Sequence, residues 1–259
     1  MKYRYGRAGL LRLCLLLVCL SILPGSTVLA ATTGVSPDGV DSPDGFATGL
    51  LALWYSGVRT YDDKPAKNDL QTHELKAEYG VTDSWTPGIW ADFTRNPDQA
   101  VYVKNMTVDS TFQLWGMEEK WVDAAVRIQY THNFQPGIAD TVATKLLLEK
   151  QFGKFLNRAN LGAQQGVGAY ATGGPNLSFL WSSRYLLNDY FKPGFEIQSD
   201  FGQDRQITGS IDKQQHFVGP AAYGEITDDI RYRAAYLFGV SGAAAQSAAR
   251  VQLLYLKDF

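Results

Sequence analysis

Apolar and polar residues alternate with a period of two along most of the chain beyond its N-terminal region. Over residues 122–130, for example, Val126 and Ile128 fall on one face, while Arg127 and Gln129 fall on the other. Successive side chains of a strand point to opposite faces, so this pattern predicts β-strands with one apolar and one polar face. A half-exposed soluble sheet shows the same alternation, and the pattern alone leaves the class of β protein open.

The alternation predicts about twelve strands whose connections are short and long in turn. The expected strands are residues 47–57, 70–80, 85–94, 103–115, 122–130, 141–152, 159–170, 176–187, 195–202, 215–225, 230–239 and 248–259. Short connections fall at 81–84, 116–120, 153–155, 188–190 and 227–229, and longer ones at 58–69, 95–100, 131–140, 171–175 and 203–213. An even number of strands connected in this order predicts an all-β fold, an antiparallel transmembrane β-barrel with both termini in the periplasm. Pro220 lacks the N–H group that a sheet ladder needs, so we expect a bulge within residues 215–225.

Residues 1–30 are expected to be a secretory signal peptide and not part of the fold. A basic start precedes an apolar run at 13–23, and Ala30 ends a small-residue cleavage site. A retained anchor helix is the competing interpretation, but the apolar run is shorter than the roughly 20 residues that span a bilayer. The two cysteines, Cys14 and Cys19, lie in this segment. We therefore expect a mature chain without disulfides or thiol chemistry.

Residues 31–46 are expected to be a periplasmic N-terminal linker, followed by a barrel over residues 47–259. The tetrapeptide Ser-Pro-Asp-Gly occurs at 36–39 and again at 42–45, which is typical of turns. The aspartates could hold calcium, but two spaced turns are the favoured interpretation. We expect a mobile segment that partly occludes the periplasmic mouth of the barrel.

Charge and hydropathy narrow the class of protein. The chain has 24 basic and 26 acidic side chains, and loss of the four basic residues of the signal leaves 20 and 26. This acidic balance argues against a nucleic-acid partner. No apolar run after residue 31 approaches the length of a spanning helix, which excludes a helical inner-membrane protein. A soluble periplasmic β protein and a closed barrel remain.

Nearly all charges within the expected strands lie on the face opposite to the apolar residues. An arginine or lysine on the lipid face at mid-depth costs about 2–4 kcal/mol, so the charged face is expected to line the lumen. Acidic and basic side chains are close to balance there, which suits cross-strand pairing in a narrow lumen. The expected pore-lining residues are Glu74, Lys76, Glu78, Asp92, Asp109, Asp123, Arg127, Lys145, Glu149, Arg158, Arg184, Glu196, Asp200, His216, Arg231, Arg233 and Arg250.

The strand ends carry aromatic residues and, at the C-terminus, a candidate assembly signal. Aromatics near strand ends are expected to form interfacial girdles, and the set is Trp85, Trp121, Tyr130, Tyr185, Tyr223, Tyr236 and Tyr255. Ordinary sheet packing would also enrich these residues.

The last strand presents Val251, Leu253, Tyr255 and Phe259 on one face, as expected of a signal read by the outer-membrane barrel assembly machinery. Lys257 falls on the same face near the strand end, where it can snorkel to the headgroups.

The sequence offers little for catalysis or metal binding. The three histidines, His73, His132 and His216, are scattered, and none has a serine two residues away on a shared strand face. Asp200 with His216 near the outer rim is the remaining pair that could activate water. We expect no enzyme activity, no catalytic residues, no metal site and no cofactor.

Several segments resemble an outer-membrane β-barrel family named after the meta-pathway of phenol degradation, a group regarded as transporters. The resemblance rests on residues 78–85 (EYGVTDSW), 215–220 (QHFVGP), 231–240 (RYRAAYLFGV) and the closing strand to Phe259. It spans most of the expected barrel. Lys257 departs from the family, which usually has an apolar or aromatic residue two positions before the final Phe. The resemblance implies passive or facilitated movement of small molecules, including hydrophobic or aromatic ones.

The leading hypothesis is a channel or transporter in the bacterial outer membrane, with a mixed-charge lumen that passes small molecules. Its expected partners are outer-membrane lipids, the barrel assembly machinery and a small-molecule solute. The second hypothesis is a closed structural or surface-binding barrel whose paired charges fill the lumen without transport. The third is a soluble periplasmic β protein.

Overall fold

The computed structural model describes residues 35–97, 99–116, 120–203 and 210–259, and these residues form twelve strands and one short 3₁₀ turn. The signal peptide and the start of the expected linker lie outside the described residues and remain predictions. The strands are β1 (Leu50–Tyr61), β2 (Gln71–Tyr79), β3 (Trp85–Arg95), β4 (Tyr102–Trp115), β5 (Asp123–Asn133), β6 (Asp140–Phe152), β7 (Phe155–Val167), β8 (Asn176–Tyr185), β9 (Lys192–Gln203), β10 (Gln215–Glu225), β11 (Ile230–Gly239) and β12 (Ser247–Asp258), with η1 at Ile211–Lys213. No helix among the described residues is long and apolar enough to cross a membrane.

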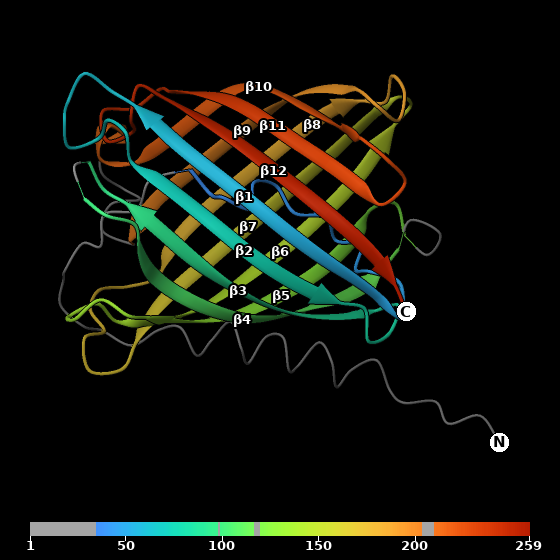
Figure 1. Ribbon diagram of the computed structural model, residues 1–259, viewed down its shortest axis with the longest axis horizontal. Helices are drawn as coiled ribbons and strands as arrows, with labels where there is room; N and C mark the ends of the chain where they lie inside the picture. The colour runs from blue at the N-terminus through green and yellow to red at the C-terminus, as the bar shows by residue number, and fades with distance from the viewer. Residues whose placement is uncertain (1–34, 98, 117–119, 204–209) are drawn as a thin grey trace.

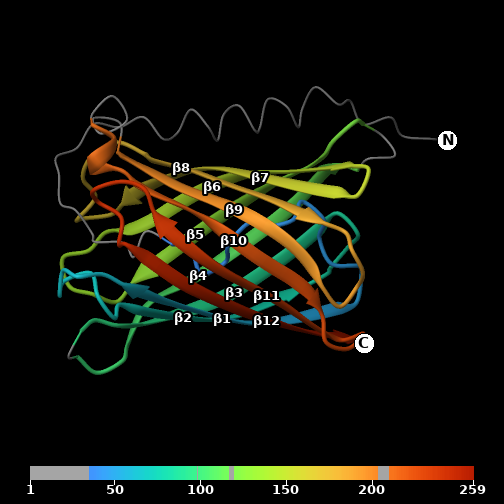
Figure 2. The same ribbon diagram turned by 90° about the horizontal axis from the view of Figure 1, so that it is seen from above.

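Each strand pairs antiparallel with its neighbour in sequence, and β1 pairs with β12, so the sheet closes into a barrel (Figures 1 and 2). The closing pair runs in unbroken register from Leu50 opposite Asp258 to Tyr61 opposite Ser247. The expected twelve-strand antiparallel barrel is confirmed. The largest boundary differences are four residues: β1 ends at Tyr61 and not at residue 57, and β7 begins at Phe155 and not at residue 159. The start of β7 was not recognised because polar Asn157 points outward there, where the pattern requires an apolar residue.

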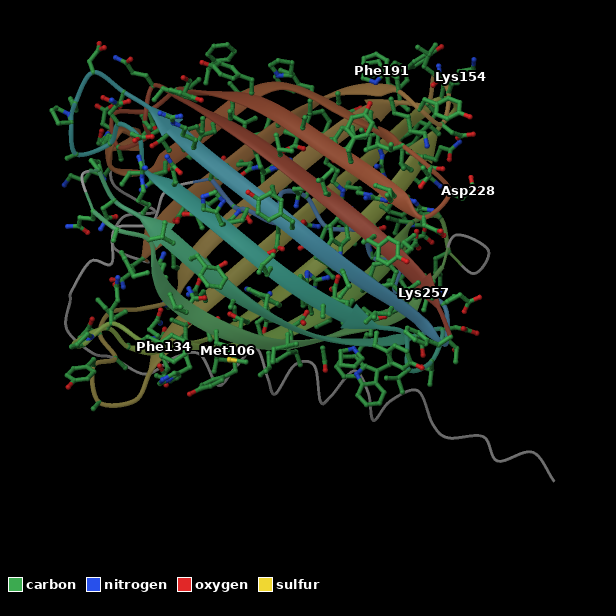
Figure 3. All side chains as sticks on the ribbon, in the orientation of Figure 1. Met106, Phe134, Lys154, Phe191, Asp228 and Lys257 are labelled. Carbon is green, nitrogen blue, oxygen red and sulfur yellow. The ribbon has the colours of Figure 1, made fainter. Side chains whose placement is uncertain are left out.

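The connections separate the two ends of the barrel, which we call the turn end and the loop end. Lys154, Phe191 and Asp228, from three short connections, lie at the same end as Lys257 and the C-terminus, while Phe134 lies at the opposite end (Figure 3). At the turn end, β6 and β7 are joined by only Gly153 and Lys154. Gly153 adopts φ +57°, a conformation that favours glycine in so tight a turn.

Apolar side chains cover the outside of the barrel. Outward residues such as Leu75, Ile89 and Val108 remain 54%, 41% and 48% exposed, although they lie in the middle of their strands. A soluble sheet would bury such a face, so this exterior is suited to lipid. Aromatic and cationic pairs mark its margins, among them Trp85 stacked on Phe112 at 6.3 Å and Lys150 Nζ 6.0 Å from the Trp121 ring.

Two expectations about individual residues are wrong. The register between β10 and β11 is the same on both sides of Pro220, so Pro220 causes no bulge. The pairing with β11 lapses at Gly219 and Pro220, while Pro220 stays in register opposite Phe195 of β9. Tyr223, expected in an outer girdle, points into the lumen, where its hydroxyl donates to Glu196.

A lipid-facing charge provides a test of the exterior. We expect Val108→Arg to lower the free energy of unfolding by about 2–4 kcal/mol, because the guanidinium would sit in the hydrocarbon at mid-strand. The matched control is Val101→Arg, at an exposed position between β3 and β4, where the charge meets water. Urea titrations in lipid vesicles measure both, and equal costs for the two variants would contradict a membrane-embedded exterior.

Candidate functional site

The segment before β1 runs through the lumen of the barrel and fills much of it. Residues 35–46, which we call the plug, appear as the blue trace inside the ribbon (Figure 2). Val35 packs at the loop end in a cluster with Phe217 and Leu237, and Phe46 packs near the turn end against Leu254 and Leu256. A dozen extended residues reach about 40 Å, enough to follow the whole lumen. The described part of the expected mobile linker, residues 35–46, thus lies deep in the barrel and not at its mouth.

The wall of the barrel satisfies the backbone of the plug with amide side chains. A buried peptide group needs a hydrogen-bond partner, and the plug forms no strand that would supply one. The bonds run from Ser36 N to Gln198 Oε1 (2.9 Å), from Asp41 N to Asn160 Oδ1 (2.7 Å), from Asn160 Nδ2 to Asp41 O (3.1 Å) and from Gln252 Nε2 to Asp38 O (2.9 Å). Strands β7, β9 and β12 therefore hold the plug at fixed positions.

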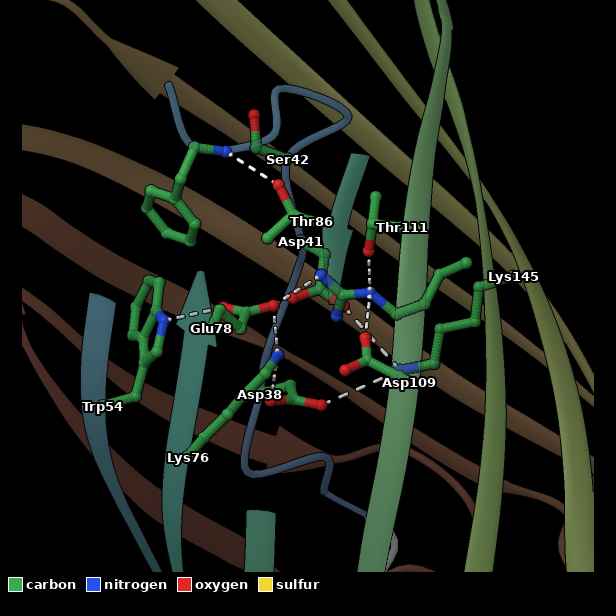
Figure 4. Close-up of polar contacts among 12 residues, drawn as sticks. Asp38, Asp41, Ser42, Trp54, Lys76, Glu78, Thr86, Asp109, Thr111 and Lys145 are labelled. Carbon is green, nitrogen blue, oxygen red and sulfur yellow. Dashed lines mark hydrogen bonds and ion pairs between the residues drawn. The ribbon is translucent and has the colours of Figure 1, made fainter. Parts of the chain in front are cut away.

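Two aspartates of the plug face the basic side chains of the wall (Figure 4). The Asp38 carboxylate lies 3.8 Å from both Lys76 Nζ and Lys145 Nζ. Asp41 Oδ2 lies 3.0 Å from Arg127 Nη1 and 3.7 Å from Lys145 Nζ. These five side chains are buried or half-buried, so their charges attract one another with little screening by water.

Arg127 connects the plug to the charges of the wall. Its guanidinium reaches Asp109 at 3.1 Å and Glu78 at 3.2 Å, and its Nε donates to Thr111 Oγ1 at 2.7 Å. Glu78 also accepts from Trp54 Nε1 at 2.8 Å. The section of lumen around Arg127 is consequently packed with paired side chains.

A second buried pair lies on the opposite wall. Arg250 Nη2 is 2.7 Å from Glu196 Oε1, and both side chains are 1% exposed. Tyr223 donates to the same carboxylate at 2.6 Å. Gly39 of the plug adopts φ +63° directly over the Arg250 guanidinium, where an added Cβ would approach Cζ to 2.6 Å. Glycine is required there by both its backbone angle and this close approach.

The turn that follows the plug is tied to the barrel by one exposed carboxylate. Thr48 donates its hydroxyl to Asp83 Oδ1 at 2.8 Å and its backbone N–H to the same atom at 3.3 Å. These hydrogen bonds stabilise the ionised form and hold the pKa of Asp83 below its usual value.

The structure places the expected pore-lining residues on the inward phase of their strands, with one exception. The inward set comprises Glu74, Lys76, Glu78, Asp92, Asp109, Asp123, Arg127, Lys145, Glu149, Arg158, Arg184, Glu196, Asp200, Arg231, Arg233 and Arg250. His216 is the exception, because its neighbour Phe217 is fully buried in the loop-end cluster and side chains alternate along a strand. His216 instead lies at the rim, where it contacts the Phe201 ring edge-on. Asp200 and His216 are therefore on opposite faces of the wall and cannot act together on a water.

The sequence pattern did not reveal the residues that hold the plug. Asp38 and Asp41 lie in a segment whose sequence predicts turns, and Asn160 is one of many polar residues on the inward faces of the strands. The available signal was the spacing of Asp38, Asp41 and Asp44, because an extended chain with three residues per turn brings such positions to one side. That spacing, set against a wall with lysines and arginines, predicts a segment complementary to the lumen.

A cavity of about 380 Å³ remains at the turn end of the lumen, beside plug residues 41–47. Its lining combines arginines of β7, β8 and β11 with apolar residues of β1, β12 and the plug. We call this cavity the turn-end chamber. Among the described residues, no group of three or more His, Cys, Asp or Glu side chains has an arrangement that could hold a metal ion.

Comparison with known proteins assigns the fold. No family model matches the chain, and no curated protein matches it in sequence. Among solved structures, the COG4313 outer membrane channel from Pseudomonas putida F1 is similar with a TM-score of 0.58 and 13% identity over 83% of this chain and 97% of that chain. The NanC porin has a TM-score of 0.55 and 10% identity, covering 78% of this chain and 98% of its own. The KdgM porin has a TM-score of 0.55 and 7% identity over 79% of this chain and 98% of its own.

These likenesses concern the fold, which is that of porins and outer-membrane channels. Together with the apolar exterior, the closed barrel places the protein in the bacterial outer membrane, in contact with lipid.

Proposed function

We propose that the protein is an outer-membrane channel for the passive passage of small molecules, held closed by the plug. The observation that carries the proposal is the chemistry of the lumen. The wall is charged, and it presents Lys76, Arg127 and Lys145 to a segment that is not part of the sheet. Because such side chains are readily hydrated, the lumen can fill with water when the plug leaves. Polar interiors of this kind are typical of barrels that form aqueous channels.

The rest of the proposal follows from the arrangement of the barrel. Its turn end would face the periplasm, as in barrels with short periplasmic turns and longer outer loops. The solutes would be small molecules, including hydrophobic or aromatic ones, as the resemblance to the family named after the meta-pathway of phenol degradation implies. Val251, Leu253 and Tyr255 face outward on β12 and Phe259 is exposed, so the barrel assembly machinery would have access to the proposed signal.

A closed barrel without transport is the second candidate, and a specific observation favours it. The plug is joined to the wall by ion pairs and by hydrogen bonds from several strands, and such contacts can stabilise a permanent filling. The two candidates differ in whether the plug can leave the lumen.

Neutralising the plug tests the proposal. The double variant Asp38→Asn with Asp41→Asn removes the ion pairs to Lys76, Arg127 and Lys145 and leaves nearly the same volume. We expect the open fraction in planar lipid bilayers to rise about tenfold or more, because repulsion among the basic side chains then favours a hydrated lumen.

The matched control is Asp44→Asn, which changes an exposed plug carboxylate that forms no ion pair with the described residues. It should behave like the unmodified protein. If the double variant folds but its current stays as low as that of the control, the closed barrel is the better description.

A further inference from the structure

We propose that the turn-end chamber binds a small organic anion, one that carries a carboxylate on an apolar body. This assignment names the solute class of the channel and so rests on the proposed function, although binding to the chamber does not itself require transport. Three guanidinium groups, those of Arg158, Arg184 and Arg233, supply the cationic side of the chamber. Apolar residues of β1, β12 and the plug adjoin these groups in the lining. The chamber therefore offers both halves of an amphipathic ligand a matching surface.

Two of the arginines have no carboxylate partner. Among the described residues, no acidic side chain lies within ion-pair distance of Arg184 or Arg233, whereas Arg158 is paired with Glu149. The charges of Arg158, Arg184 and Arg233 also repel one another. Glu149 and Asp41 attract Arg184 and Arg233 from beyond ion-pair distance, and Arg233 also donates to the backbone oxygen of Val40 at 3.5 Å. A cationic cluster in a confined space that is only partly compensated is stabilised further by an anion.

Aromatic rings fix the directions of the two unpaired guanidinium groups. Arg184 Cζ lies 5.1 Å from the centre of the Tyr223 ring, and Arg233 Cζ lies 4.7 Å from that of Trp54. Cation–π contacts hold an arginine in place without neutralising its charge. The Arg184 Nε atom is buried and has no hydrogen-bond partner. A carboxylate can accept hydrogen bonds from two nitrogen atoms of one guanidinium, and such paired bonds are among the strongest that side chains form.

Three of the four acidic residues around the chamber are already engaged by basic side chains, and the fourth, Asp44, is exposed and accepts a hydrogen bond from Ser42. The lining of the chamber includes six basic and four acidic side chains. Glu225 lies 3.6 Å from Lys192 and 3.7 Å from Arg231, at the turn-end mouth. Asp41 and Glu78 pair with Arg127, toward the middle of the lumen. The remaining charge of the chamber is positive and is concentrated at the arginines of β8 and β11.

The apolar part of the lining selects for an apolar body. Leu254 and Leu256 of β12 are buried in a small cluster, with Phe46, Leu50 and Trp54 packed against it. These residues point inward, although most inward positions of the barrel are polar. Phe46, Leu50 and Trp54 are only partly buried, so their contact with a ligand would remove apolar surface from water. The volume of about 380 Å³ is at the small end of the range for ligand pockets, which suits a molecule of one ring or a short chain.

Binding to the purified full-length protein in detergent tests the assignment, with three probes. Benzoate carries both features, benzamide has the same shape without the charge, and inorganic phosphate has charge without an apolar body. Isothermal titration calorimetry should show benzoate binding more tightly than either of the others, by about tenfold or more. Benzoate binding should also weaken as salt is raised.

Substitution of the unpaired arginines locates the site. Arg184→Gln with Arg233→Gln should raise the Kd of benzoate by about tenfold or more. The matched control is Arg59→Gln, since Arg59 pairs with Asp69 at the loop end, far from the chamber, and this variant should keep the original Kd. Retention of the heat-modifiable, compact form on gels shows that each variant is folded.

The outcomes separate this inference from the channel proposal. Equal binding of benzoate and benzamide, equal binding of phosphate and benzoate, or an unchanged Kd in the folded double variant would each overturn the assignment. Benzoate binding that depends on Arg184 and Arg233 supports the site even if bilayers show no current. Current without such binding leaves the channel in place and removes the site.

Discussion

Removal of the plug is expected to convert the barrel into a persistently open pore. A chain lacking residues 35–46 should show steady current in planar bilayers, where the unmodified protein should show only rare openings. The reason is volume, because the plug fills the lumen from the Val35 cluster at the loop end to Phe46 at the turn end. We expect the ratio of open to closed time to rise by well over tenfold, each tenfold corresponding to about 1.4 kcal/mol in the balance between closed and open states.

The control for the deletion replaces the same twelve residues with a Gly-Ser sequence of equal length. That segment lacks the carboxylates of Asp38 and Asp41, so it should occupy the lumen only transiently and give a fluctuating current. Sequence-specific closure is shown if the native plug alone keeps the current low. A deletion variant that inserts, folds and passes no current would reject the channel and favour the closed barrel.

Loss of Arg250 is expected to destabilise the barrel more than any other single substitution in the lumen. Arg250→Met removes the partner of Glu196 and leaves a carboxylate that is almost fully buried. Tyr223 and Gln198 would still donate to that carboxylate, but neither carries a charge. Breaking a buried pair from one side costs about 3–5 kcal/mol, and we expect a loss of this size in urea-induced unfolding from detergent micelles.

The double variant Arg250→Met with Glu196→Gln removes both charges of the pair. It therefore distinguishes the cost of an unpaired buried carboxylate from the cost of losing the Arg250 side chain. Once the buried charge is gone, the double variant should recover a large part of the stability that Arg250→Met loses. Arg59→Met is the surface control, because Arg59 pairs with Asp69 while its side chain is 53% exposed, and it should cost less than about 1 kcal/mol. Comparable losses in Arg59→Met and Arg250→Met would show that burial of the lumen pair has no energetic consequence.

The fold could be predicted because lipid imposes a strict pattern on the wall. Each strand of the barrel must place apolar residues outside, so the alternation persists from β2 to β12, and the limits of β11 follow from it directly. The direction of a side chain was predicted wrongly where a polar residue faces outward or an apolar residue faces inward. His216 was assigned to the lumen because it is polar, but fully buried Phe217 next to it faces inward and packs against Val35 of the plug.

The candidate site was only partly predictable. The charged wall followed from the same alternation, since side chains that avoid lipid must face the lumen. Leu254 and Leu256 are exceptions, because they are apolar residues that line the lumen. They were not recognised because their strand is apolar on both faces near its end. The unpaired state of Arg184 and Arg233 could not be read from the near balance of charges, because pairing depends on distances between strands that are not adjacent.

The sequence by itself predicted strands with one apolar and one charged face, because period-two alternation is a local property that each strand displays alone. The even number of strands and the alternation of short and long connections favoured a closed barrel with a charged interior. Only the tertiary structure decided what fills that interior. A short, polar, proline-containing segment has no periodicity to reveal its place, and Asp38 and Asp41 acquire partners only when β2, β5 and β6 close around them. The plug and the turn-end chamber beside it are products of closure, which brings residues distant in sequence to the same few ångströms.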